Sequence, residues 1–165
     1  MNKNSDIIGR QKEIQKLDGI IQSKKSEFLA IYGRRRIGKT FLVREYFDYK
    51  FDFQVSGLAN ADTAQQLFNF DTVLRKQSPQ FFDTPSGNWL VAFQRLMEHL
   101  EHVANPGKKV VFFDELPWFD TPGSDFMMGL EHFWNSFASN RKDILLIVCG
   151  SAASWMVNVL INNSG

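Results

Sequence analysis

One short segment constrains the fold of this chain more than any other. Residues 33–40 read Gly-Arg-Arg-Arg-Ile-Gly-Lys-Thr and fit the pattern G-x-x-x-x-G-K-[ST] at every fixed position. The apolar stretch 27–32 leads directly into the first glycine, and residues 40–46 continue as a helix-like segment. A strand, a glycine-rich loop and a helix in this order are the context in which the pattern binds phosphates. We therefore expect a phosphate-binding loop at the end of the first strand.

The residue types in this loop suit a nucleoside triphosphate. Its glycines let consecutive backbone N–H groups point at phosphate oxygens, and the helix N-terminus adds unpaired donors and a positive dipole end. We expect Lys39 to reach the β- and γ-phosphates and Thr40 to ligate Mg²⁺ through its hydroxyl. The side chains of the three arginines are either phosphate clamps or solvated loop charges. The candidate nucleotide-binding residues here are Gly33, Arg34, Arg35, Arg36, Ile37, Gly38, Lys39, Thr40 and Phe41.

A second motif, residues 110–115, reads Val-Val-Phe-Phe-Asp-Glu and is an apolar run that ends in two adjacent carboxylates. Asp114 is placed to hold the same magnesium ion as Thr40, usually through water. Glu115 follows it and points differently, so it can take a proton from an attacking water molecule. The two motifs together predict a protein that binds a nucleoside triphosphate with Mg²⁺ and hydrolyses it.

Strand-like and helix-like segments alternate along one domain that spans residues 1–165. The expected strands are 27–32, 51–56, 109–114 and 144–149. The expected helices are 10–23, 40–46, 61–76, 86–103, 124–139 with Ser124 as a plausible N-cap, and 151–161. This alternation predicts an α/β fold of three layers, with a parallel sheet between helices on both faces. Ligands bind such sheets at the carboxyl ends of the strands, where Gly33, Asp114 and Ser151 fall.

Composition and charge argue against several classes of function. The net charge of +1 predicts no general attraction to DNA or to acidic membranes. The first residues lack the apolar stretch of a signal peptide, and no apolar run approaches the ~20 residues that span a bilayer. Cys149 lies in the apolar run 144–149, so we expect a buried core residue rather than a nucleophile. We expect a soluble cytoplasmic protein.

The sequence resembles the P-loop ATPases in which an extra strand separates the strands of the Walker A and Walker B motifs. More narrowly, it is similar to the prokaryotic AAA-type ATPases related to the STAND class, often called archaeal-type ATPases. The resemblance rests on residues 8–17 (Ile-Gly-Arg-Gln-Lys-Glu-Ile-Gln-Lys-Leu), the Walker A motif 33–40 with its Arg-rich interior, the Walker B motif 110–115, and residues 146–151.

The resemblance implies roles for further residues. Ile8, Gly9 and Arg10 would line the adenine site, although a surface salt bridge is the alternative for Arg10. Ser151 would be the sensor 1 residue that detects the γ-phosphate, or else it only caps the following helix. With Glu115 and Lys39, Ser151 completes the set of candidate catalytic residues. The sheet order would be 5-1-4-3-2.

The resemblance also implies segments beyond Gly165. These are a fifth strand, an arginine finger or sensor 2 residue, and a winged-helix domain, so we expect the chain to be the N-terminal part of the ATPase. Strand 27–32 would then be an exposed edge, and hydrolysis by this part alone would be weak. A second copy of the chain or a partner protein could supply the arginine finger. A membrane partner is not expected, and nucleic acid is not indicated.

Three functions stay open at this point. They are an ATPase whose hydrolysis drives a conformational cycle, a nucleotide-dependent switch with negligible turnover alone, and a P-loop small-molecule kinase. The pair of Asp114 and Glu115 argues against the kinase, which must avoid activating water, and no Arg-rich lid follows residue 120. Two smaller signals have structural readings. His99 and His102 are expected on a solvated helix face rather than at a metal, and residues 117–119 are either buried or a partner surface.

Overall fold

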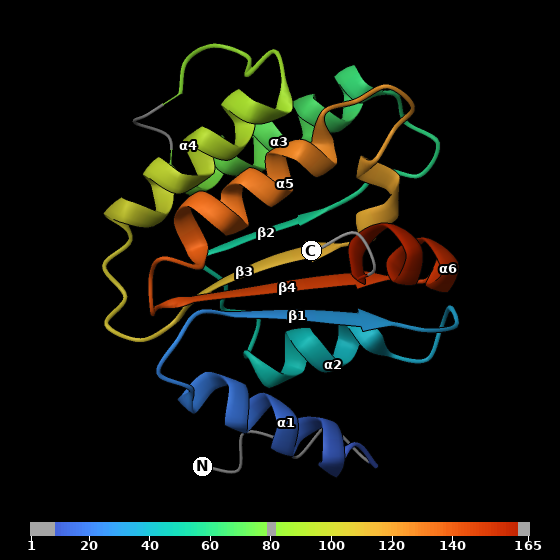
Figure 1. Ribbon diagram of the computed structural model, residues 1–165, viewed down its shortest axis with the longest axis vertical. Helices are drawn as coiled ribbons and strands as arrows, with labels where there is room; N and C mark the ends of the chain where they lie inside the picture. The colour runs from blue at the N-terminus through green and yellow to red at the C-terminus, as the bar shows by residue number, and fades with distance from the viewer. Residues whose placement is uncertain (1–8, 79–81, 162–165) are drawn as a thin grey trace.

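The computed structural model of the chain describes residues 9–78 and 82–161, and these form a parallel four-stranded sheet between two layers of helices (Figure 1). The strands are β1 (Glu27–Tyr32), β2 (Phe53–Ser56), β3 (Lys109–Asp114) and β4 (Ile144–Gly150). Their order is β1-β4-β3-β2, and every pair is parallel. This agrees with the expected α/β fold and with the part of the expected order that the described strands can test. Among the described residues, β1 and β2 are the edge strands.

The helices occupy both faces of this sheet. Figure 1 shows α1 and α2 on one side and α3, α4 and α5 on the other. Their bounds are α1 Gln11–Gln22, α2 Lys39–Tyr46, α3 Thr63–Gln77, α4 Trp89–His102, α5 Phe126–His132 and α6 Ala153–Trp155. A 3₁₀ turn, Leu116–Phe119, follows β3, and π-helical turns, Phe133–Ala138 and Met156–Ile161, continue α5 and α6. None of the described helices is long and apolar enough to cross a bilayer.

Side-chain alternation along the strands divides the core between the two faces. On β3, Val110 and Phe112 contact the layer of α1 and α2, whereas Val111 and Phe113 contact the layer of α3, α4 and α5. All six residues of β3 and all seven of β4 are buried, as expected for central strands of a sheet covered on both faces. The two central strands therefore hold their carboxyl ends in a rigid frame.

An aromatic cluster anchors the turn after β3 to the helical layer. Phe119 is fully buried, stacks on Phe126 at 5.2 Å between ring centroids, and meets Trp89 edge-on at 5.8 Å. Such aromatic pairs add ~0.5–1.5 kcal/mol each beyond the area that they bury. Pro117 and Trp118 are half-buried. The predicted burial of residues 117–119 is thus confirmed for Phe119 and only partly for Pro117 and Trp118.

Two expected helix starts differ from the structure because side-chain caps decide them, and a third differs without such a cap. α4 begins at Trp89 because the Asn88 side chain accepts a hydrogen bond from the Val91 N–H at 2.9 Å. α3 begins at Thr63 behind a capping box formed by Asp62 and Gln65. The prediction of Ser124 as N-cap was wrong, since α5 begins one residue later, after Asp125, which makes no side-chain cap bond.

The start of β2 also differs from the expected strand 51–56. The Asp52 carboxylate accepts the Val110 N–H at 2.7 Å, while the Asp52 N–H donates to the Val110 carbonyl at 3.0 Å. The side chain therefore replaces the next ladder bond, and the regular strand begins only at Phe53.

The prediction of a solvated face was wrong for His99. This side chain is buried, with Nε2 2.8 Å from the Asp52 carbonyl and Nδ1 in contact with the Ser78 hydroxyl. His102 is exposed, as expected. Within residues 9–78 and 82–161, no group of three or more His, Cys, Asp or Glu side chains is placed to hold a metal. His99 is a structural residue that ties α4 to α3 and β2.

Candidate nucleotide-binding site

The loop 33–40 leaves β1 and turns directly into α2. Gly38 is the N-cap of α2 and has a φ of 80°, a left-handed conformation that glycine adopts without steric cost. Arg36 has a φ of 61° and makes the preceding tight turn. The loop therefore curls back over the N-terminus of α2, where unpaired backbone N–H groups and the positive dipole end favour an anion.

Lys39 lies in the mouth of this loop and is only 9% exposed. Its ammonium donates to the carbonyl oxygens of Gly33 at 2.9 Å and Arg34 at 2.6 Å. These bonds hold the positive charge of Lys39 inside the curve of the loop. A phosphate bound in the loop would replace these carbonyls as the acceptor of the Lys39 hydrogen bonds, because a charged phosphate oxygen is a stronger acceptor than a neutral carbonyl.

The two sequence motifs meet in one hydrogen bond. The Thr40 hydroxyl lies 2.9 Å from Oδ2 and 3.1 Å from Oδ1 of Asp114, which is 7% exposed. The Glu115 N–H also donates to Oδ1 at 2.9 Å, so the carboxylate is oriented from two sides. A hydroxyl beside a single carboxylate is an oxygen donor set that suits Mg²⁺, which completes its shell with waters and phosphate oxygens. The residues present therefore fit this ion.

Glu115 adopts a left-handed conformation, with φ 50° and ψ 44°, which is uncommon for a residue other than glycine. Its carbonyl accepts the Trp118 N–H at 3.1 Å, and the neighbouring Asp114 carbonyl accepts the Gly57 N–H at 2.9 Å. Gly57 follows β2, and a Cβ atom there would lie only 2.5 Å from the Glu115 carbonyl oxygen. The turn that carries Glu115 thus needs glycine at position 57.

The candidate residues surround a cavity of about 580 Å³ at the carboxyl ends of the strands. Ser151 enters it directly after β4, where Gly150 packs against the ring of Pro117. The loop 33–40, the carboxylates after β3 and the serine after β4 therefore share one cavity, as the strand ends predicted. Its lining residues are Arg35, Arg36, Gly38, Lys39, Thr40, Phe41, Gly57, Ala59, Asp114, Glu115, Trp118, Gly150 and Ser151.

Some candidate residues lie outside this lining. Gly33, Arg34 and Ile37 contribute backbone carbonyls or shape to the loop, and none of the three lines the cavity. The Arg10 guanidinium donates to the Ile37 carbonyl and lies 3.7 Å from the Glu13 carboxylate. Gly9 is exposed, and the predicted role of Ile8 lies outside the described residues. Arg10 therefore supports the loop and also makes the alternative salt bridge.

Sequence reasoning missed four residues at or beside this site. Gly57, Ala59 and Trp118 line the cavity, and the Arg44 guanidinium lies 3.9 Å from Oδ2 of Asp114. One signal was available for the first two, because they follow the expected second strand and its carboxyl end lies at the same rim. Arg44 could have been found from its position four residues after Thr40, on the same face of α2.

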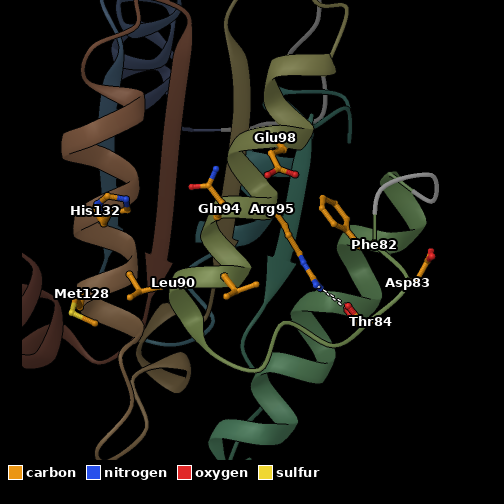
Figure 2. A pocket seen from close by; sticks show the side chains of 10 residues that line it. Phe82, Asp83, Thr84, Leu90, Gln94, Arg95, Glu98, Met128 and His132 are labelled. Carbon is orange, nitrogen blue, oxygen red and sulfur yellow. Dashed lines mark hydrogen bonds between the residues drawn. The ribbon is translucent and has the colours of Figure 1, made fainter.

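A second cavity, drawn in Figure 2, has a volume of about 690 Å³. It shares no lining residue with the first. It lies along α4 and α5 and beside residues 82–84, with Leu90 and Met128 among its apolar walls. Arg95 crosses its edge, donating to the Thr84 hydroxyl oxygen at 3.1 Å and lying over the Phe82 ring at 5.2 Å. None of the Walker motif residues lines it.

Burial keeps the single cysteine out of this chemistry. Burial raises the pKa of the Cys149 thiol to about 12, and the nearby Asp114 carboxylate acts in the same direction. The thiol is therefore protonated at neutral pH, as expected for a core residue rather than a nucleophile.

Comparisons with known proteins identify the same fold. The sequence profile of a family described as an ATPase domain predominantly from Archaea matches residues 7–165. Among solved structures, Cdc6p from Pyrobaculum aerophilum matches with a TM-score of 0.65 and 14% identity over 93% of this chain. The ORC2 protein of Aeropyrum pernix, in its ADPNP–ADP complexes, matches with 0.59 and 18% over 94%. A Walker-type ATPase of Pyrococcus abyssi matches with 0.57 and 16% over 88%.

These matches cover less than half of the solved structures, namely 42% of Cdc6p, 45% of ORC2 and 46% of the Walker-type ATPase. At such identities they establish the fold of the matched part. No curated protein sequence matches this chain.

Proposed function

Because this chain belongs to the family of ATPase domains found predominantly in Archaea, we propose that it binds ATP and ADP with Mg²⁺ and hydrolyses ATP to drive a conformational cycle. One observation carries the proposal: the Thr40 hydroxyl lies 2.9 Å from the Asp114 carboxylate inside the cavity that Lys39, Glu115 and Ser151 also line. No other arrangement in the described residues brings a phosphate-binding loop, a carboxylate pair and a polar strand end together.

The binding step belongs to the loop and α2. The backbone N–H groups of the loop and the N-terminus of α2 hold the phosphates, and Lys39 transfers its hydrogen bonds from the Gly33 and Arg34 carbonyls to phosphate oxygens. Thr40 and Asp114 would hold Mg²⁺, which when bound neutralises charge on the β- and γ-phosphates. Phe41 lines the cavity beside the loop and would contact the nucleoside.

The hydrolytic step belongs to the turn after β3. Glu115 lines the cavity and is aimed by its left-handed backbone, so its carboxylate would accept a proton from the attacking water. Ser151 would donate a hydrogen bond to the γ-phosphate from the end of β4. Both groups sit on rigid strand ends, so they keep their positions relative to the loop.

A nucleotide-dependent switch with slow turnover is the second candidate, and the cavity lining favours it for the chain alone. The cationic side chains that line the cavity within the described residues are Arg35, Arg36 and Lys39, all from the loop itself. An arginine finger from outside the loop is worth ~10³–10⁵ in rate. A second copy of the chain or a partner protein would supply it.

Calorimetry of ATP and ADP binding, followed by multiple-turnover phosphate release, tests the proposal and separates the two candidates. We expect binding of both nucleotides and turnover well below ~1 per second for the chain alone, since typical enzymes reach ~10 per second with a complete site. A turnover number that rises with protein concentration or with an added partner would show that another chain completes the site. Failure to bind either nucleotide would refute the proposed function, and fast turnover alone would refute the need for a finger.

A further inference from the structure

Arg44 is the charged side chain nearest the Walker B carboxylate that the proposed function does not use. It lies on α2, four residues after Thr40, so both side chains project from the same face of the helix. Thr40 contacts Asp114 from within the nucleotide cavity, at 2.9 Å from Oδ2. The Arg44 guanidinium lies 3.9 Å from the same oxygen.

Arg44 approaches Asp114 from a different cavity. That cavity, of about 430 Å³, lies beside the edge strand β2 and is lined by Arg44, Gln54, Ser56 and Asn69 among others. The only residue that it shares with the nucleotide cavity is Asp114. Arg44 therefore contacts the metal-ligating carboxylate without lining the space that the nucleotide would fill.

The contact is electrostatic rather than orienting. At 3.9 Å, the guanidinium nitrogen is beyond hydrogen-bond distance from Oδ2. The Asp114 carboxylate is already oriented by the Thr40 hydroxyl and by the Glu115 N–H at 2.9 Å. Removal of the Arg44 charge would therefore leave the carboxylate in place and would change only the potential around it.

Resting on the proposed function, we infer that Arg44 is a counter-ion that competes with Mg²⁺ for the Asp114 carboxylate and so lowers the affinity of the site for the metal. A fixed positive charge opposes the approach of a second cation to the same oxygen. The Arg44 side chain is 39% exposed, so solvent screens part of this repulsion, and it acts as a moderate brake on metal binding.

The ratio of two dissociation constants for ATP measures this competition: the constant in EDTA divided by the constant in saturating Mg²⁺, both from calorimetry. We expect Arg44→Gln to raise this ratio on the order of 3–10-fold, the range that a partly screened unit charge produces a few ångströms from a binding ion. Arg44→Lys keeps the charge and should change the ratio less than about twofold. Lys76→Gln removes one charge from an exposed position of α3 and is the matched control.

If Arg44 has only a structural role, its substitution would raise both dissociation constants by the same factor and leave their ratio unchanged. If the wild-type chain binds ATP but the ratio in Arg44→Gln is unchanged or lower, this inference is overturned and the proposed function is not. The same holds if Arg44→Lys behaves like Arg44→Gln. A wild-type chain that binds ATP in neither condition would overturn the proposed function and this inference with it.

Discussion

Substitution of Gly57 by alanine tests whether the loop after β2 aims the Walker B glutamate. The added Cβ would lie 2.5 Å from the Glu115 carbonyl oxygen, 3.0 Å from Cβ of Trp118 and 3.3 Å from the Phe119 ring. Ordinary carbon–oxygen contacts are ~3.3–3.6 Å. The turn that carries Glu115 must therefore move by about 1 Å, because two of the three contacts involve backbone or Cβ atoms that cannot rotate away.

We expect two measurable effects of Gly57→Ala. Overpacking of this kind costs about 1–3 kcal/mol, which lowers the melting temperature by roughly 2–12 °C in a chain of this size. A displacement of about 1 Å at a catalytic group can cost on the order of 10²-fold in rate. ADP affinity should change little, since the loop 33–40 and α2, which would hold the phosphates, contain neither Gly57 nor Glu115. Circular dichroism measures the melting temperature, single-turnover phosphate release measures the rate, and calorimetry measures the ADP affinity.

Gly19→Ala is the matched control for this experiment. Gly19 lies inside α1, and a Cβ atom there meets nothing within 4 Å. This substitution should stabilise the chain by about 0.5–1 kcal/mol through helix propensity and should leave hydrolysis unchanged. A Gly57→Ala chain with wild-type melting temperature and wild-type hydrolysis would refute the argument that this close contact fixes Glu115.

Three further predictions concern other residues of the chain. Lys39→Ala should weaken ADP binding by at least about tenfold, because charge-assisted hydrogen bonds contribute ~1.5–3 kcal/mol; calorimetry that shows equal affinity would contradict this role. Asp114→Ala should weaken Mg²⁺-dependent ATP binding, whereas Glu115→Gln should keep binding and suppress hydrolysis; equal loss of binding in both variants would show that the roles are misassigned. The free energy of unfolding should fall as pH rises from about 9 towards 12, because burial raises the pKa of Cys149 to about 12 whereas an unfolded thiol ionises near 8.5, so the unfolded chain loses its proton first. Cys149→Ala should show a shallower fall over this pH range in denaturant titrations, and an identical pH dependence in the two chains would count against the buried thiol as its cause.

Local sequence patterns were sufficient wherever a feature depends on residues close together in the chain. β1 and β3 begin and end at the expected residues, because an apolar run between polar flanks specifies a strand, although only β3 is fully buried. The loop 33–40 was predictable for the same reason, since glycines and a lysine at fixed spacing specify its backbone. Helix starts were less predictable, because the residue that caps a helix is chosen by geometry as well as by type. Ser124 was a good cap by type, yet the helix begins after Asp125.

The sequence by itself determined the fold class and the rim at which the candidate site residues meet, because these residues follow strand ends and parallel strands bring those ends together. The tertiary structure alone decided which side chains support that site. The burial of His99 depends on the Asp52 carbonyl and the Ser78 hydroxyl, and the need for glycine at position 57 depends on the Glu115 carbonyl. The position of Arg44 beside Asp114 depends on how α2 packs against β3. These partners are far apart in the chain, and no periodicity or spacing encodes a contact that forms only when separate elements pack together.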